Sequence, residues 1–298
     1  MDSPQSYVEG FARDGYVLAR ESAVALFVSE RLGRPLLVEG PAGVGKTELA
    51  RTLARTQGRP LIRLQCYEGL DESRALYEWE YTKQLLYTQI LRDKVGEMLG
   101  EATTLHDAVA RLNEQGTAFF SREFLLPRPI LQALLSETPA VLLIDEIDRA
   151  DEEFEAFLLE VLADYAVTIP EIGTVSAIHR PTVVLTSNGT RNLSDALRRR
   201  CLFLYVDFPS RDMEREVLAR RVPDLDGALA ERVVRYVEKV RALDLRKTPG
   251  VSETIDWAAT LVLLHARSLA PEVVKSSLCA LLKERSDQEK VLREGISG

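Results

Sequence analysis

The chain has 298 residues, of which 46% are hydrophobic and 28% charged, and its formal net charge is −8. This is the composition of a globular protein, and the acidic excess disfavours a duplex DNA binder, which needs many cations on phosphates. The sequence has no apolar run of about 18 residues, no visible signal peptide, and three cysteines outside any metal pattern. We therefore expect a cytoplasmic protein that is not integral to a membrane and binds no nucleic acid.

Five short segments are rich in aliphatic and β-branched residues and are flanked by turn or helix signals. Several are almost continuously apolar, as a strand buried on both faces of a parallel sheet is. Helical patterns separate them, so we expect residues 1–208 to form an α/β domain with a five-stranded, mainly parallel sheet. The expected strands are residues 36–39, 61–66, 141–145, 182–188 and 202–208.

The connection between the second and third expected strands is far longer than a single crossover needs. We expect a helical insertion at about residues 70–130, with helices over 77–100 and 104–114 and an N-cap at Thr103 or Thr104. Aromatic residues in this insertion would either pack a long helix onto the sheet or contact a partner. They are Tyr77, Trp79, Tyr81 and Tyr87.

Residues 209–298 have helical periodicity and little strand signal, so we expect a small all-helical domain. Ser, Asp and Pro stand where helices begin, since Ser and Asp cap helix N-termini and Pro suits the first turn. The expected helices are residues 211–221, 227–242, 252–270 and 271–284, and the expected start signals are Ser210, Asp226, Ser252 and Pro271.

Residues 40–47 read Gly-Pro-Ala-Gly-Val-Gly-Lys-Thr and follow an apolar run. This is the phosphate-binding pattern G-x-x-x-x-G-K-[ST], placed where a strand turns into a helix. Glycines let backbone N–H groups close around phosphate oxygens, and the positive end of the following helix favours an anion. Lys46 would carry charge to the β- and γ-phosphates, and Thr47 would ligate Mg²⁺. The expected ATP-binding residues are Gly40, Pro41, Ala42, Gly43, Val44, Gly45, Lys46, Thr47 and Glu48.

Two acidic residues, Asp145 and Glu146, follow four apolar residues. Asp145 then stands at the carboxyl end of a buried strand, where ligands bind in such sheets, and would hold Mg²⁺ through water. Glu146 would orient or deprotonate the water that attacks the γ-phosphate. The alternative is a strand that ends in a solvated acidic turn.

Polar residues also mark the last two expected strands. Asn188 ends one of them, where its amide could hydrogen-bond the attacking water and the γ-phosphate, although Asn is common at strand-to-turn junctions. Arg198, Arg199 and Arg200 precede the other strand. Such a run is commonly a solvated helix end. A guanidinium there could instead reach the γ-phosphate of a neighbouring subunit, which accelerates phosphoryl transfer by about 10³–10⁵.

The order of these four features, followed by a helical lid, resembles the AAA+ ATPases. Residues 145–150, Asp-Glu-Ile-Asp-Arg-Ala, are similar to the D-E-[IN]-x-R-A run of the MoxR branch, and residues 167–173 look like the hairpin that this branch places before its Asn strand. Residues 67–71 and 77–81 look most like the CoxD-type subgroup. That subgroup is associated with maturing molybdenum-containing carbon monoxide dehydrogenase and its relatives.

The resemblance implies an AAA+ P-loop domain followed by the lid, with Lys46 and Thr47 on phosphate and Mg²⁺. Asp145 and Glu146 match the second motif, Asn188 the sensor, and Arg200 the trans-acting finger, with Arg199 as the fallback. It also implies that the adenine pocket lies near residues 15–18 and the lid. The lid arginine of the family should fall near residues 250–254, where this sequence has none.

We therefore expect a Mg²⁺-dependent ATPase (an ATP phosphohydrolase) that acts as a chaperone on a protein client, such as a molybdenum hydroxylase. The resemblance implies a homo-hexamer and a partner with a von Willebrand type A domain. One alternative is an ATP-binding switch with little turnover, which the missing lid arginine favours. Another is an AAA+ motor that acts on DNA, which the net charge disfavours.

Overall fold

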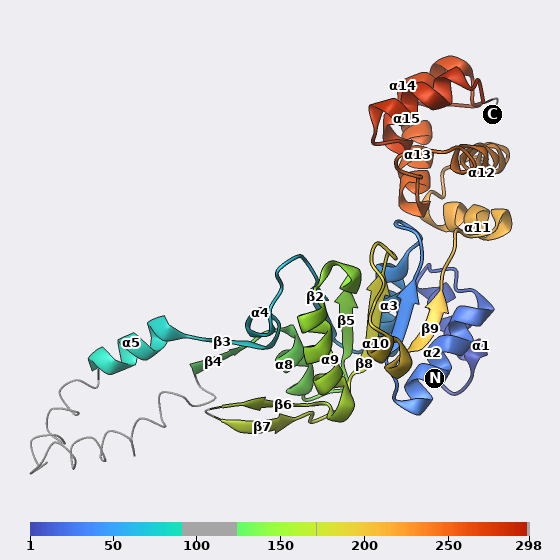
Figure 1. Cartoon of the computed structure of the whole chain (residues 1–298). Helices are drawn as coiled ribbons and strands as arrows, with labels where there is room; N and C mark the ends of the chain where they lie inside the picture. Colours follow the sequence, from blue (N-terminus) through green and yellow to red (C-terminus); the bar gives the residue numbers. More distant parts are fainter. Residues whose placement is uncertain (91–123, 171, 297–298) are drawn as a thin grey trace, which may run out of the picture.

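The computed structural model describes residues 1–90, 124–170 and 172–296 (Figure 1). Its main sheet has five strands in the order β2-β5-β8-β1-β9, and all four neighbouring pairs are parallel. This confirms the expected α/β fold with a five-stranded parallel sheet, although three of the strands end slightly earlier than expected. The strands are β1 (Leu36–Glu39), β2 (Leu61–Gln65), β5 (Val141–Asp145), β8 (Thr182–Ser187) and β9 (Leu202–Tyr205).

Helices cover both faces of this sheet, so its central strands are buried on both sides. Along β1, Leu36 and Val38 belong to one hydrophobic cluster and Leu37 to another, as the two-residue period of a strand requires. The first cluster also contains side chains of α1 (Pro4–Arg13), α2 (Arg20–Leu32) and α3 (Lys46–Gln57). The second contains side chains of α4 (Glu72–Leu76), α8 (Pro129–Leu134), α9 (Glu152–Asp164) and α10 (Asp195–Arg200).

The insertion leaves and re-enters the domain through a small antiparallel pair, β3 (Tyr77–Trp79) and β4 (Leu125–Pro127). The expectation of a helix from residue 77 is therefore wrong at its start, because residues 77–79 pair with a segment far along the chain that local periodicity cannot reveal. Helix α5 (Tyr81–Ile90) follows. The expected helix over 104–114, its N-cap and the rest of the 77–100 helix lie outside the described residues.

Two of the aromatic residues of the insertion pack on the domain core. The rings of Tyr77 and Trp79 contact each other edge to face, 5.8 Å apart, and both pack against the main cluster. Tyr81 is exposed. Tyr77 and Trp79 therefore pack on the core as expected, but from strand β3 and not from a long helix. A second small hairpin, β6 (Ala166–Ile169) with β7 (Gly173–Ser176), precedes β8 at the position expected for it.

After β9 the chain is helical and has a hydrophobic cluster of its own. The N-caps expected at Ser210 and Asp226 are confirmed, and Pro271 lies in a first helical turn. The expected N-cap at Ser252 is wrong, because the helix already begins at Val251. Because the helical part has its own hydrophobic cluster, we propose a domain boundary between residues 208 and 209. The helices are α11 (Arg211–Arg221), α12 (Gly227–Arg241), α13 (Val251–Leu263), α14 (Pro271–Leu281) and α15 (Arg285–Arg293).

Helices α12, α13 and α14 end earlier than expected, at residues 241, 263 and 281. Helix α13 ends before residue 270 because His265 takes a positive φ of 51°, and the chain turns there into α14. Helix α15 was not expected, since it is mostly polar and of its residues only Asp287 and Val291 are buried.

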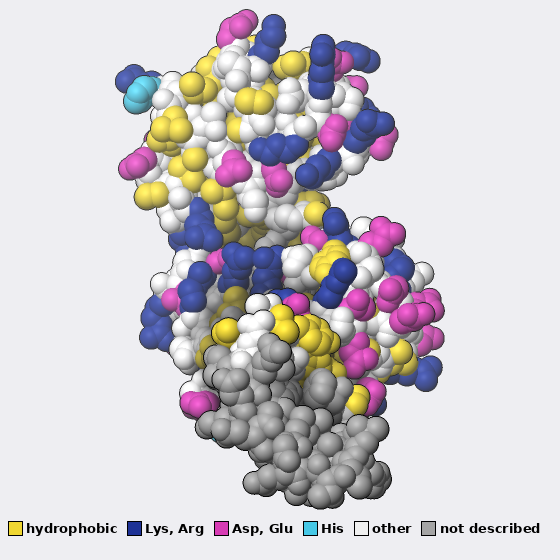
Figure 2. Space-filling view, turned by 90° about the vertical axis from the view of Figure 1, so that its left-hand side faces the viewer, with side chains coloured by type: hydrophobic (Ala, Val, Ile, Leu, Met, Phe, Trp, Pro, Cys, Tyr) yellow, Lys and Arg dark blue, Asp and Glu magenta, His cyan; other side chains and the backbone are white. Residues whose placement is uncertain are grey.

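The helical part lies over the carboxyl ends of the sheet strands (Figure 1). A buried ion pair stands where it joins the sheet: Arg241 makes two 2.7 Å hydrogen bonds to Glu214, and its guanidinium stacks on Phe208. Figure 2 shows a waist between the two parts, with Lys and Arg side chains on its α/β rim. Within the described ranges every helix is too short or too polar to cross a membrane.

Candidate nucleotide-binding site

The phosphate loop connects the carboxyl end of β1 to the start of α3. Gly43 and Gly45 have φ angles of 80° and 95°, which residues with side chains rarely adopt. A Cβ on Gly40 would lie 1.9 Å from the carbonyl oxygen of Val206, so only glycine fits there. The backbone of α3 first bonds from Leu49 N–H to the Gly45 carbonyl. The preceding N–H groups of the helix start are left for another acceptor, which is how such a loop binds phosphate.

Lys46 is buried in the middle of this loop, with 7% of its surface exposed. Its ammonium donates to the carbonyl oxygens of Gly40 and Pro41, both at 2.7 Å, and to Asn188 Oδ1 at 2.8 Å. Burial lowers the pKa of this ammonium, and nearby carboxylates, Asp148 foremost, offset part of that effect. All three hydrogen-bond donors are used within the protein. A phosphate bound here would therefore have to replace some of these acceptors.

Thr47 and Asp145 meet at the mouth of the loop and fit a Mg²⁺ site. Thr47 Oγ1 donates to Asp145 Oδ1 at 2.9 Å, and Thr186 Oγ1 donates to the same oxygen at 2.6 Å. Because its proton points at the carboxylate, the Thr47 hydroxyl has lone pairs free for a cation. Hydroxyl and carboxylate oxygens are the hard ligands that Mg²⁺ prefers, and phosphates and water usually complete its shell. In the part of the chain that the structure describes, no three His, Cys, Asp or Glu side chains gather into another metal site.

Glu146 follows in a left-handed backbone conformation with φ of 57°, which is uncommon for a residue with a side chain. Its N–H donates to Thr186 Oγ1 at 2.9 Å, which fixes the turn. Its carboxylate accepts from Gln65 Nε2 at 3.1 Å and pairs with Arg149 Nε at 2.9 Å. Both contacts are made to the same carboxylate oxygen, Oε2, and they hold the side chain beside the end of β2.

Asn188 is the first residue after β8, and its side chain reaches Lys46. Its backbone N–H donates to Asp148 Oδ2 at 3.2 Å, and the same oxygen accepts from the Thr190 N–H at 3.1 Å and hydroxyl at 2.6 Å. Burial raises the pKa of Asp148, but the hydrogen bonds from Thr190 and Asn188 outweigh it and leave the pKa below its ordinary range. The charged Asp148 therefore fixes the turn that carries Asn188.

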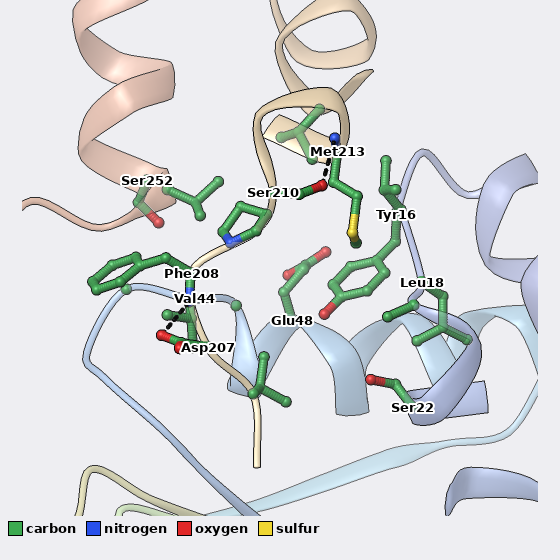
Figure 3. A pocket seen from close by; sticks show the side chains of 18 of the residues that line it. Tyr16, Leu18, Ser22, Val44, Glu48, Asp207, Phe208, Ser210, Met213 and Ser252 are labelled. Carbon is green, nitrogen blue, oxygen red and sulfur yellow. Dashed lines mark hydrogen bonds between the residues drawn. The ribbon is translucent and has the colours of Figure 1, made fainter. Parts of the chain in front are cut away.

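A cavity of about 350 Å³ lies beside the phosphate loop, between the residues before α2 and helices α11 and α13 (Figure 3). Residues 15–18, where the adenine pocket was expected, line it together with Met213 and Ile255 of the helical part. Figure 3 shows Glu48 between Tyr16 and Met213. Burial raises the pKa of the Tyr16 hydroxyl, and the charge of Glu48 adds to this, so the hydroxyl stays a donor.

The helical part touches the phosphate loop directly where the family's lid arginine was expected. Val251 N–H, at the start of α13, donates to the Gly43 carbonyl at 2.9 Å. A Cβ on Gly250 would lie 2.6 Å from the Gly43 Cα, so the two glycines pack backbone against backbone. A second bridge joins Arg221 of α11 to Glu48 of α3 at 3.8 Å. The position without an arginine is therefore occupied by a backbone contact.

The three arginines of α10 do not share one environment. Arg198 pairs with Glu39 Oε2 at 2.8 Å, at the carboxyl end of β1. Arg199 and Arg200 are exposed and lie beyond the amino ends of the strands, on the side of the sheet opposite the phosphate loop. They line a hollow of about 460 Å³ with Arg34 and Arg180, and none of the described residues that line it is acidic.

The end of α10 is held in place from β1. Arg34, just before that strand, donates to the carbonyl oxygens of Arg199 at 2.7 Å and Arg200 at 3.3 Å. Among the described residues, the Arg200 guanidinium makes only a long hydrogen bond, 3.4 Å, to the Leu159 carbonyl. Its backbone is thus fixed while its side chain is left in solvent, and it lies too far along the sheet to reach the phosphate loop of its own chain.

Several residues of this site were missed from the sequence. Thr186 and Asp148 orient the acidic pair and Asn188, and Gln65 and Arg63 bind the acidic pair from β2. A signal existed in β2, where Arg63 and Gln65 alternate with Leu64 at the two-residue period of a strand. Polar residues at alternate positions near the carboxyl end of β2 indicate side chains at the edge of the sheet where Asp145 lies.

Comparison with known proteins finds a matching family and several relatives. Residues 35–201 match the family described as AAA domain (dynein-related subfamily). Gas vesicle ATPase GvpN of Haloferax mediterranei is 25% identical over 273 residues, covering 88% of this chain and 73% of that protein. An uncharacterized protein of Staphylococcus haemolyticus is 27% identical over 293 residues, covering 94% and 96%. A RuvB variant of Thermotoga maritima has a TM-score of 0.49 and 18% identity, covering 90% of this chain and 69% of that one.

The family match starts just before β1 and ends after α10, so it includes the phosphate loop, the acidic pair, Asn188 and the three arginines. It extends over more than half of the chain. The chain therefore belongs to the AAA domain family, in its dynein-related subfamily.

Proposed function

We propose that this protein is a Mg²⁺-dependent ATPase of the MoxR type that couples ATP hydrolysis to the remodelling of a protein client. One observation carries the proposal: three segments far apart in the chain bring their polar ends together at one edge of the sheet. Lys46 bonds Asn188, and Thr47 bonds Asp145, so the phosphate loop, the acidic pair and the end of β8 form one connected site. The family membership supports hydrolysis at that site.

The proposed reaction is an in-line attack of water on the γ-phosphate. Lys46 exchanges the carbonyls of Gly40 and Pro41 for phosphate oxygens, and the loop N–H groups take the rest of the negative charge. Thr47 and Asp145 would hold Mg²⁺, which would supply positive charge beside the β- and γ-phosphates. Glu146 accepts the proton of the water, whose oxygen bonds the γ-phosphorus while the bond to the β-phosphate oxygen breaks.

The nucleoside would occupy the cavity beside the loop. Its lining combines apolar side chains such as Leu18 and Met213 with a few polar groups, as ligand sites usually do. Because α11 and α13 form one wall of this cavity, a bound nucleotide would touch both parts of the molecule at once. The position of the helical part could then depend on whether ATP or ADP is bound.

We propose that the active form is a homo-hexamer in which Arg200 acts on the nucleotide of the next subunit. The support is its place: it is solvent-exposed and stands at the amino edge of the sheet, opposite its own phosphate loop. A residue that cannot serve its own site requires a neighbour arranged head to tail, and such contacts form a ring where the rotation between neighbours closes. Arg199 is the alternative finger, because it lines the same hollow.

The client is proposed on resemblance. Residues 67–71 and 77–81 favour a CoxD-type role in maturing a molybdenum hydroxylase, with a von Willebrand type A domain protein as partner. Two relatives carry the name gas vesicle ATPase, which favours instead a client that forms an assembly. Both clients are proteins, and we place the reaction in the cytoplasm. The genes beside this one test the choice, since a molybdenum hydroxylase cluster would identify the first client class.

A nucleotide-gated switch with little turnover is the second candidate. Gln65 and Arg149 hold the Glu146 carboxylate, and such a resting state would suit a slow enzyme. The test is steady-state phosphate release by the wild type and by Glu146→Gln, with the exposed Glu152→Gln of α9 as the matched control. We expect phosphate release by the wild type and Glu152→Gln, and a loss of 10²-fold or more, on the order of a general base, in Glu146→Gln. Equal rates near zero in all three proteins would favour the switch.

A motor that acts on DNA is the third and weakest candidate, because the chain carries a net charge of −8. Phosphate release that stays unchanged when duplex DNA is added, with no salt-dependent binding, is the expected result. Stimulation by DNA that falls steeply with salt would overturn the assignment of a protein client.

A further inference from the structure

The metal-binding carboxylate proposed above already holds a cation from its own chain. Arg63 Nε donates to Asp145 Oδ2 at 3.0 Å, and Arg63 Nη2 donates to the same oxygen at 2.6 Å. The other carboxylate oxygen accepts the hydroxyls of Thr47 and Thr186. Asp145 is only 2% exposed, so this guanidinium neutralises a carboxylate that would otherwise be buried with a full negative charge.

Arg63 owes this position to the place of β2 in the sheet. The strand stands at the edge, so one of its sides faces no further strand, and the Arg63 side chain is 40% exposed. Its register partner on β5 is Leu143, two residues before Asp145, which lets the guanidinium extend along β5 to the carboxylate. Nη2 also donates to Gln65 Oε1. The pair therefore joins a buried carboxylate to a partly exposed guanidinium.

We propose that Arg63 is a positioning residue that competes with the divalent cation for Asp145. In the protein alone it holds the carboxylate in the orientation that contacts Thr47. A cation that approaches Thr47 and Asp145 must displace the guanidinium from Oδ2 or bind against its positive charge. Metal and Arg63 therefore oppose each other at one carboxylate. The inference rests on the proposed function, because it concerns the metal that accompanies the nucleotide.

Mg²⁺ dependence of nucleotide binding measures this competition. A fluorescent, non-hydrolysable ATP analogue is titrated onto the full-length chain in chelator and at rising Mg²⁺, and the Mg²⁺ concentration that gives half of the affinity gain is recorded. Arg63→Gln should lower that concentration by about tenfold, the value of one charge-assisted hydrogen bond. Affinity in chelator should stay within about twofold of the wild type.

Two variants make the result specific. Arg74→Gln removes a guanidinium from α4, and this arginine pairs with Asp71 rather than with the site, so it should leave the half-maximal Mg²⁺ unchanged. Arg63→Lys keeps the charge but loses the paired donors, so it should lie between the wild type and Arg63→Gln, and it serves if the glutamine variant does not fold. A half-maximal Mg²⁺ concentration that stays the same or rises in both Arg63 variants overturns the proposal. Failure of the wild type to bind the analogue would instead remove the proposed function itself.

Discussion

Lys46 uses all its donors inside the protein, on Gly40, Pro41 and Asn188, and it stays buried. The polar groups of the site therefore form hydrogen bonds with one another. The same holds for Asp145, whose oxygens are shared among two hydroxyls and a guanidinium. The cost of leaving any of these groups unpaired explains why each has a hydrogen-bond partner within the chain.

Lys46→Ala should abolish measurable ATP binding while the chain stays folded. The substitution removes the buried charge that faces the β- and γ-phosphates. It leaves three acceptors without a donor, at a cost of about 1–3 kcal/mol for each group that water cannot reach. Binding of a fluorescent ATP analogue and thermal unfolding measure the two effects. Lys275→Ala, at an exposed position of α14, is the control and should change neither. ATP binding of ordinary strength by Lys46→Ala would falsify the role of this loop.

At the scale of elements, α13 and the phosphate loop act on each other through backbone atoms. Gly250 precedes α13, and its N–H donates to the Glu253 carboxylate at 3.0 Å. Gly43 opposes it with its carbonyl bonded to Val251 N–H. Movement of the loop on nucleotide binding would therefore move the start of this helix. The contact gives the helical part a way to sense the nucleotide without a lid arginine.

Gly250→Ala should weaken nucleotide binding by pushing α13 off the loop. Its φ of −82° suits any residue, so the effect is steric: the new Cβ would lie 2.6 Å from the Gly43 Cα and 2.9 Å from its carbonyl carbon. Loss of one backbone hydrogen bond, about 1 kcal/mol, corresponds to about fivefold in affinity. Calorimetric titration with ADP measures it. Gly227→Ala, at the start of α12 with nothing within 4 Å of its Cβ, should bind as the wild type does; equal affinity of both variants and the wild type would exclude the coupling.

At the scale of the whole molecule, the nucleotide loop and the exposed arginines lie at opposite edges of one parallel sheet. Leu202 N–H of β9 bonds the Pro35 carbonyl before β1, so the end of α10 is fixed at the amino edge. The phosphate loop leaves from the carboxyl edge of the same strand. Copies arranged head to tail would bring one edge against the other, which is why assembly and hydrolysis are coupled in the proposed ring.

Arg200→Ala should keep ATP binding and lose hydrolysis by a factor of about 10³–10⁵, the value of a trans-acting arginine. Mixing it with Glu146→Gln should restore part of the phosphate release, because some interfaces then join an intact Glu146 to an intact Arg200. Mixing it with the double variant Glu146→Gln, Arg200→Ala creates no such interface and should restore nothing. Full activity of Arg200→Ala alone would contradict a trans-acting role for Arg200 and leave Arg199 as the candidate.

Much of this architecture was readable from the sequence alone. The bounds of β1 and β5, the caps at Ser210 and Asp226 and the phosphate loop all depend on neighbours within a few residues, and local spacing records such dependence. The α/β fold was predicted correctly for the same reason. The catalytic roles of Lys46 and the acidic pair remain predictions.

Other features were decided only by the tertiary structure. The strand at residues 77–79 exists because residues 125–127 pair with it, and Arg63 reaches Asp145 because β2 lies beside β5. Gly250 meets Gly43 only once the helical part lies over the sheet. In each case the partners are separated by tens to hundreds of residues, and their contact depends on how whole elements pack. A pattern of neighbouring residues carries no record of that packing.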